Sequence, residues 1–148
     1  MGGDGVESGT RSSYAVRVAD QPVHDTHDPA DVDWLQAGGS SRDQGRYVEL
    51  ISRSLTGSEV LFFGISWLEP GETHILHHHP EAEELYYVIE GTAIFTVGDE
   101  EIRGEPGTAI FLPKGTPHRI FNDGSTKLAF SWCFSRPELK EVGIVWDE

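Results

Sequence analysis

From residue 45 onward, the chain consists of short apolar runs that are interrupted at regular intervals by turn-forming residues. The interruptions are rich in glycine, proline, aspartate and asparagine, which favour tight turns. The apolar runs cover residues 46–52, 60–68, 73–79, 85–90, 92–97, 108–112, 118–122 and 127–134. Regularly spaced strands of this length, separated by turns, are typical of antiparallel sandwiches and barrels. The pattern therefore predicts an all-β fold.

Several of these runs are apolar at consecutive positions, as in residues 61–65 and 85–89. A strand that has one face in water alternates between apolar and polar residues, whereas a strand covered on both faces does not. One face of each run can line the interior of a barrel, and the other must meet a second sheet or another subunit. We therefore expect a homodimer.

The two ends of the sequence differ in composition and periodicity from the region of apolar runs. Residues 1–45 are rich in glycine, serine and aspartate and show no sustained hydrophobic period, apart from one possible strand at 14–18. We expect a loop-rich N-terminal segment that is partly disordered, above all in its first dozen residues. The barrel is then expected over 46–135, followed by a C-terminal tail at 136–148, with one short helix around 136–141.

The charge of the chain limits its partners. A formal net charge of −14 arises from 25 acidic and 11 basic residues, and a surface of this sign repels nucleic acids and anionic membranes. No apolar run approaches the ~20 residues that span a bilayer. The N-terminus also lacks the basic and then apolar order of a secretory signal. We expect a cytoplasmic protein that binds neither nucleic acid nor membrane.

Two segments carry the residues that suggest chemistry. Residues 71–91 read GETHILHHHPEAEELYYVIEG, and residues 107–122 read GTAIFLPKGTPHRIFN. Position for position, these segments resemble the two conserved motifs of the cupin superfamily. The resemblance implies an antiparallel, jelly-roll type β-barrel and one divalent metal ion, held by His77, His79, Glu84 and His118.

Elementary chemistry agrees with such a site. Side chains alternate across a strand, so His77 and His79 project to the same face. Three imidazoles and one carboxylate buried together are costly without a cation. Nitrogen and oxygen donors of this kind suit a transition metal such as Fe, Mn, Ni or Zn and disfavour Ca and Mg. Four protein ligands would leave positions open to a substrate on an octahedral ion.

Other polar residues near the motifs are weaker candidates. The alternation of side chains directs Glu83 away from Glu84, and directs His78 away from its two histidine neighbours. His74 is expected at the barrel mouth or in solvent. His24 and His27, which lie in a loop, are expected on the solvated surface.

The same alternation suggests which residues surround the metal. Tyr86 and Val88 share the face of Glu84, and Ile120 and Asn122 share the face of His118. Aromatic residues on other strands could line the cavity or simply pack in the core, and these are Trp67, Phe130, Trp132 and Phe134. Candidate clamps for a substrate carboxylate are Arg53, Arg103 and Arg119.

Three kinds of function are compatible with these residues. The first is an Fe(II)-type dioxygenase that oxidises a small organic substrate. The second is a non-oxidative enzyme of the isomerase, lyase, decarboxylase or polyketide-cyclase type, in which the metal is a Lewis acid and Tyr86 or Glu84 moves a proton. The third is a non-catalytic protein that binds a small molecule. We expect an enzyme, and the dioxygenase is the first of the three hypotheses.

Overall fold

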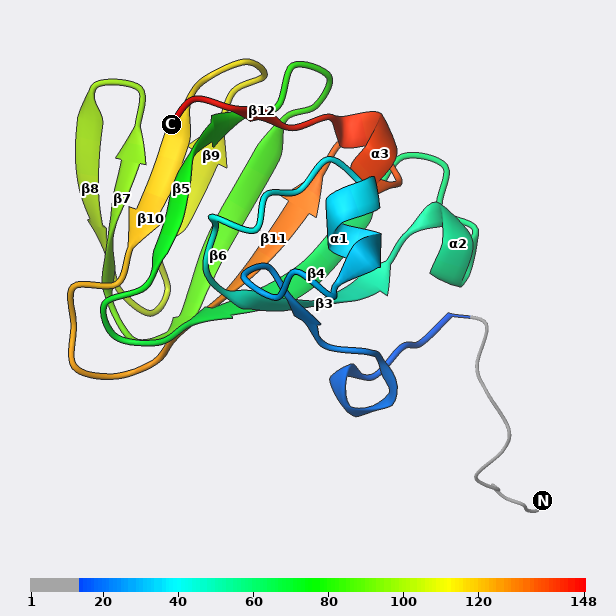
Figure 1. Cartoon of the computed structure of the whole chain (residues 1–148), viewed down its shortest axis with the longest axis horizontal. Helices are drawn as coiled ribbons and strands as arrows, with labels where there is room; N and C mark the ends of the chain where they lie inside the picture. Colours follow the sequence, from blue (N-terminus) through cyan, green and yellow to red (C-terminus); the bar gives the residue numbers. More distant parts are fainter. Residues whose placement is uncertain (1–13) are drawn as a thin grey trace.

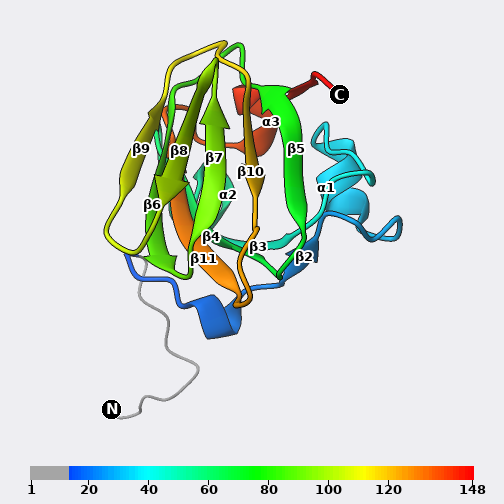
Figure 2. The ribbon, with the colours of Figure 1, turned by 90° about the vertical axis from the view of Figure 1, so that its left-hand side faces the viewer.

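Two antiparallel β-sheets face each other in the computed structural model, which describes residues 14–148 (Figure 1). The strand order is β12-β5-β10-β7-β8 in one sheet and β2-β3-β4-β11-β6-β9 in the other. Figure 2 shows the two sheets from the side, with their strands wrapped around a common interior. The expected all-β, jelly-roll architecture is confirmed.

The strands of the first sheet are β5 (Thr73–His78), β7 (Ala93–Val97), β8 (Glu100–Gly104), β10 (His118–Phe121) and β12 (Val145–Trp146). The strands of the second sheet are β2 (His24–Asp25), β3 (Arg46–Ile51), β4 (Phe62–Leu68), β6 (Glu84–Glu90), β9 (Ala109–Leu112) and β11 (Leu128–Phe134). Short helix η1 (Val18–Asp20) precedes β2, and short helices α1 (Val32–Gln36), α2 (Arg53–Thr56) and α3 (Leu139–Val142) lie between strands. All of the predicted runs after residue 45 are strands. Strand β8 was not predicted, because its residues are mostly polar and it is held by pairing with β7.

The hydrophobic core fills the space between the sheets. In strand β6, the side chains alternate between the core and the outside: Glu84, Tyr86 and Val88 are buried, and the residues between them are exposed. The outward residues of this sheet include Leu85, Tyr87 and Ile89 of β6 and Phe111 of β9, which are large, apolar and exposed in the single chain. The consecutive apolar runs therefore place one face in the core and leave an apolar face outside.

The N-terminal segment contains less strand than expected. No strand forms over 14–18, and this expectation was wrong, because the edge of the sheet beside β3 is taken by β2. Asp31 is the N-cap residue of helix α1, and its side chain accepts a hydrogen bond from the backbone N–H of Trp34. The disorder predicted for the first dozen residues lies outside the described part of the chain.

The segments before β3 and after β11 meet at one end of the sandwich. The rings of Trp34 and Trp146 lie edge to face at 5.9 Å, and Nε1 of Trp146 donates to the carbonyl of Gly38. Helix α3 forms where a short C-terminal helix was expected, and β12 then pairs with β5. Residues before β3, such as Thr26 and Trp34, and residues after β11, such as Ile144 and Trp146, therefore contribute to the walls of the interior. Within residues 14–148, no helix is both long and apolar enough to cross a lipid bilayer.

Candidate metal centre

Three buried histidines converge at the inner face of the first sheet. His77 lies near the end of β5, His79 follows that strand, and His118 begins the neighbouring strand β10. Strand pairing places His118 directly opposite His77. One nitrogen of each imidazole lies within 4.8 Å of the others, so the three side chains could hold a metal ion.

The backbone fixes the orientation of all three rings. The Nδ1 atoms lie 2.6 Å, 2.7 Å and 2.9 Å from the carbonyl oxygens of Ile75, Gly143 and Thr116, for His77, His79 and His118 respectively. A carbonyl oxygen can only accept a hydrogen bond, so each Nδ1 carries the proton. Each Nε2 then presents a lone pair, which is the form of imidazole that ligates a metal.

Glu84 completes the group from the opposite sheet. Its Oε1 atom lies 3.4 Å from Nε2 of His79 and 3.3 Å from Nε2 of His118. These three buried atoms have no hydrogen-bond partner among the described residues. Lone pairs on two nitrogens and one carboxylate oxygen repel one another at this distance unless a cation lies between them. The donor set therefore fits a bound cation.

Burial and neighbouring rings also set the protonation of the group. Burial lowers the pKa of His77, and the adjacent His74, His118 and His79 lower it further, so this ring is neutral. Burial alone would raise the pKa of Glu84, but positive charge at the positions of His118 and His79 lowers it, and the net change is downward. With these rings in the neutral form, a bound cation would supply that charge. A neutral imidazole next to an ionised carboxylate is the combination that binds a divalent metal.

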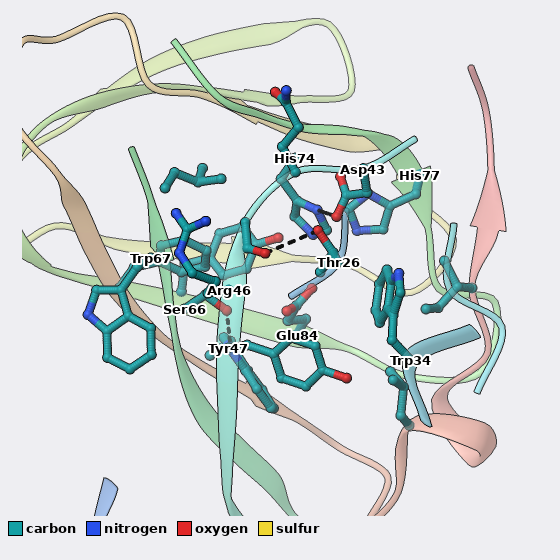
Figure 3. A pocket seen from close by; sticks show the side chains of 18 of the residues that line it. Thr26, Trp34, Asp43, Arg46, Tyr47, Ser66, Trp67, His74, His77 and Glu84 are labelled. Carbon is teal, nitrogen blue, oxygen red and sulfur yellow. Dashed lines mark hydrogen bonds and ion pairs between the residues drawn. The ribbon is translucent and has the colours of Figure 1, made fainter. Parts of the chain in front are cut away.

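The group opens onto a cavity of about 70 Å³ between the two sheets (Figure 3). His77, His79 and Glu84 form part of its wall. Much of the remaining wall is aromatic, from Trp34, Tyr47, Phe62, Trp67, Tyr86, Phe130, Trp132, Phe134 and Trp146. Tyr86 and the four other aromatic residues that the sequence suggested as neighbours all line this cavity, and four more aromatic residues join them.

Tyr86 places a buried hydroxyl in this wall. Its side chain is buried, and its hydroxyl has no hydrogen-bond partner among residues 14–148. Burial raises the pKa of Tyr86 well above 10, and the carboxylates of Glu84 and Asp43 raise it further. The phenol is therefore protonated and is a hydrogen-bond donor.

The alternation of side chains separates most of the weaker candidates as expected. Glu83 is exposed, and His78 points outward to an ion pair with Asp147 at 2.8 Å. His27 is exposed, but the expectation for His24 was wrong. The His24 ring stacks on Tyr47 at 4.8 Å and its Nδ1 lies 3.2 Å from the N-cap residue Asp31, so it is packed under helix α1.

Asn122 and the three candidate arginines make structural contacts and do not line the cavity. Asn122 is fully buried, but its amide donates to the carbonyls of Leu68 and Thr126 and so holds a turn. Arg53, Arg103 and Arg119 pair with Glu141, Asp123 and Glu148 outside the cavity. Arg46, which sequence reasoning did not single out, does line the cavity and lies 2.8 Å from Glu72.

Sequence reasoning also missed the polar side of the cavity. Thr26 and Asp43 line it from the N-terminal segment, although no local pattern distinguishes them from other loop residues. His74 also lines the cavity, and its side chain is 22% exposed. Burial lowers the pKa of His74, but the charge of Asp43 and its hydrogen bond to the ring raise it, and the net change is upward.

The fold and the site together define a small β-barrel protein with a buried histidine-rich centre, of the kind that could hold a metal beside an aromatic cavity. Residues 64–134 match the Cupin domain family. The chain is also 36% identical over 107 residues to the tetracenomycin polyketide synthase protein TcmJ of Streptomyces glaucescens, which covers 70% of this chain and 72% of that protein. This chain belongs to the cupin superfamily.

Two further relatives show the breadth of the similarity. Polyketide synthase CurC of Streptomyces cyaneus is 27% identical over 96 residues, which are 65% of this chain and 62% of CurC. The crystal structure of a predicted oxalate decarboxylase from Thermotoga maritima superimposes with a TM-score of 0.58 and 26% sequence identity. That match covers 63% of this chain and 81% of the other.

Proposed function

We propose that this chain is a metal-dependent enzyme that acts on a small organic substrate. The observation that carries the proposal is the convergence of unpaired, buried ligand atoms from His79, Glu84 and His118 beside His77, at the wall of a cavity. These four residues would hold one divalent transition metal, such as Fe, Mn, Ni or Zn. The ion would supply Lewis-acid polarisation of a substrate oxygen.

The residues of the chain supply binding and proton transfer. The aromatic side chains give the cavity a largely apolar surface, which suits an apolar or planar substrate. Tyr86 places a protonated hydroxyl in the wall of the cavity, where it can donate a hydrogen bond or a proton to a substrate oxygen. Glu84 is engaged with the histidines, so Tyr86 is the better proton donor of the two.

A non-oxidative reaction on a polyketide-type substrate has the best support. TcmJ and CurC are both named as polyketide synthase proteins, and such substrates contain several carbonyl groups that a Lewis acid and a phenol can polarise. The Fe(II) dioxygenase is the second candidate, because three nitrogen ligands and one oxygen ligand also suit Fe(II). The two differ in whether molecular oxygen is consumed.

The decisive experiment compares the protein in air and under nitrogen. We would purify it without added metal, measure its metal content by elemental analysis, and incubate it with a linear model compound that carries 1,3-dicarbonyl groups. Loss of water in both atmospheres supports the non-oxidative reaction, whereas gain of oxygen atoms in air alone supports the dioxygenase. A metal-loaded protein that binds such compounds without turnover would instead be a binding module.

Two adjacent histidines provide a matched pair of variants. His77→Ala removes an inward ligand and should abolish both metal content and turnover. His78→Ala removes the outward neighbour that pairs with Asp147, and it should leave both unchanged. Equal metal content in the two variants would contradict the proposed ligand set.

We also propose that a second copy of the chain covers the apolar outer face of β6 and β9. Leu85, Tyr87, Ile89 and Phe111 form this face, and none of these residues is charged although the chain as a whole carries −14. A self-complementary apolar contact avoids the repulsion between two acidic surfaces. Light scattering should give the mass of a dimer for the natural protein and of a monomer for Tyr87→Lys, and a concentration-independent monomer would refute the proposal.

A further inference from the structure

Strand β5 contains an extra residue that turns one more histidine toward the cavity. Along β10, His118 and Ile120 are two positions apart, whereas their partners on β5, His77 and His74, are three apart. Strict alternation would place His74 and His77 on opposite faces. The bulge reverses this, so both residues line the same cavity.

Asp43 holds the bulge and the histidine together. Its side chain is fully buried, and its Oδ1 accepts the backbone N–H of Ile75, inside the bulge, at 2.8 Å. Its Oδ2 lies 2.8 Å from Nδ1 of His74. A buried carboxylate with both oxygens engaged is a rigid support, and it fixes the proton of the His74 ring on Nδ1.

The other edge of the His74 ring is left available. The ring contacts that of His77 at a centroid distance of 4.3 Å and shares the cavity with Glu84 (Figure 3). Tyr86 lines the same cavity. Within residues 14–148, no hydrogen-bond partner engages Nε2 of His74, whereas Nδ1 is fully used by Asp43. A ring held so firmly on one edge presents its second nitrogen as a fixed polar group beside the histidine centre.

We infer that the Asp43–His74 pair is a binding site for a substrate hydroxyl group, separate from the metal. A hydroxyl both donates and accepts, so it pairs with Nε2 of His74 whether or not that nitrogen carries a proton. With the aromatic wall opposite, the site fits a small hydroxylated ring compound that places one oxygen at the histidine centre and a hydroxyl at His74. This inference rests on the proposed function, because it assumes that the first oxygen is held at the metal.

Two substitutions separate hydroxyl binding from structural support. In His74→Asn, the side-chain amide reaches as far as Nδ1 and can still donate to Asp43, but nothing replaces Nε2. In His74→Gln, the amide reaches about as far as Nε2. Both variants keep a polar group beside the buried Asp43 carboxylate, and neither changes a proposed metal ligand.

The test measures the affinity of Zn(II)-loaded protein for benzoate, meta-hydroxybenzoate and para-hydroxybenzoate by calorimetry. The shared carboxylate supplies the oxygen for the metal, and the hydroxyl is the variable. One of the two hydroxybenzoates should bind about five- to tenfold more tightly than benzoate, as expected for one added hydrogen bond. His74→Asn should lose this preference with unchanged zinc content and unchanged benzoate affinity, and His74→Gln should retain part of it.

The other possible results separate failure of this inference from failure of the proposed function. A natural protein without any preference for a hydroxybenzoate, or a preference that persists in His74→Asn, would overturn the inference while leaving the proposed function intact. Zinc loss in His74→Asn equal to that in His77→Ala would show that His74 only supports the metal ligands. A natural protein that binds no metal would overturn the proposed function itself.

Discussion

The hydroxyl of Tyr86 should contribute to activity at the expense of stability. It is buried and has no partner among the described residues, and an unsatisfied buried hydroxyl costs about 1–3 kcal/mol. The Tyr86→Phe variant keeps the ring in its edge-to-face contact with Phe130 at 5.0 Å and removes only the oxygen. We expect the free energy of unfolding to rise by about 1 kcal/mol, which corresponds to an increase in Tm of about 2–4 °C.

The same variant should lose turnover. A positioned proton donor contributes roughly 10²–10⁴-fold to a rate, so turnover should fall by about 10²-fold or more while metal content is unchanged. Urea denaturation and thermal unfolding measure the stability, and product formation under nitrogen measures the activity. Tyr87→Phe is the control, because Tyr87 is the exposed neighbour and its loss should change stability by less than about 0.5 kcal/mol.

Two results would refute this reasoning about Tyr86. A loss of stability in Tyr86→Phe would mean that the hydroxyl is hydrogen-bonded in solution and is not held ready for a substrate. Full activity in Tyr86→Phe would exclude a proton-transfer role, whatever the effect on stability. Only the combination of a more stable and less active variant supports the assignment.

Three further predictions follow from the site. His118→Ala should weaken metal binding by at least about 100-fold, measured by competition with a chelator, whereas Arg119→Ala on the exposed side of the same strand should not. Metal at about 1,000 times its Kd should stabilise the fold by about 4 kcal/mol in calorimetry, and a Tm that is independent of metal would contradict the site. The metal-depleted protein should lose stability as the pH falls below about 6.5, because the pKa of His77 is lower in the folded chain and the unfolded chain therefore binds a proton at this ring more readily. In His77→Phe this part of the pH dependence of stability should disappear. An unchanged dependence of the free energy of unfolding on pH would show that another group causes it.

The order of apolar runs and turns in the sequence was sufficient to predict the all-β fold, and the spacing of the two motifs was sufficient to indicate the candidate metal ligands. The apolar runs predicted the strands, the spacing of the cupin-like motif favoured Glu84 over Glu83, and alternation directed Glu83 and His78 outward. Alternation worked there because β6 is regular from Glu84 to Glu90 with one residue inside and the next outside.

The remaining features depend on contacts between distant residues. His74 could not be assigned by alternation, because the bulge in β5 is a property of its pairing with β10 and not of its own sequence. Asp43 reaches the cavity only because the N-terminal segment folds against the barrel, and nothing in the residues around it indicates this. Arg53, Arg103 and Arg119 looked equally suitable in sequence, and only the fold shows that each is paired with an acidic residue on the outside.

The carbonyl oxygen of Gly143, near the C-terminal end, accepts a hydrogen bond from Nδ1 of His79 and so orients a proposed metal ligand. Gly143 has a φ of 75°, a conformation that a side chain would strain, so the residue that orients this imidazole has no side chain of its own. Removal of residues 139–148 would leave every proposed ligand in the sequence and yet release the His79 ring to rotate. A protein shortened in this way would therefore lose the support of a proposed metal ligand, and residues 139–148 must be preserved in any attempt to measure what this protein binds.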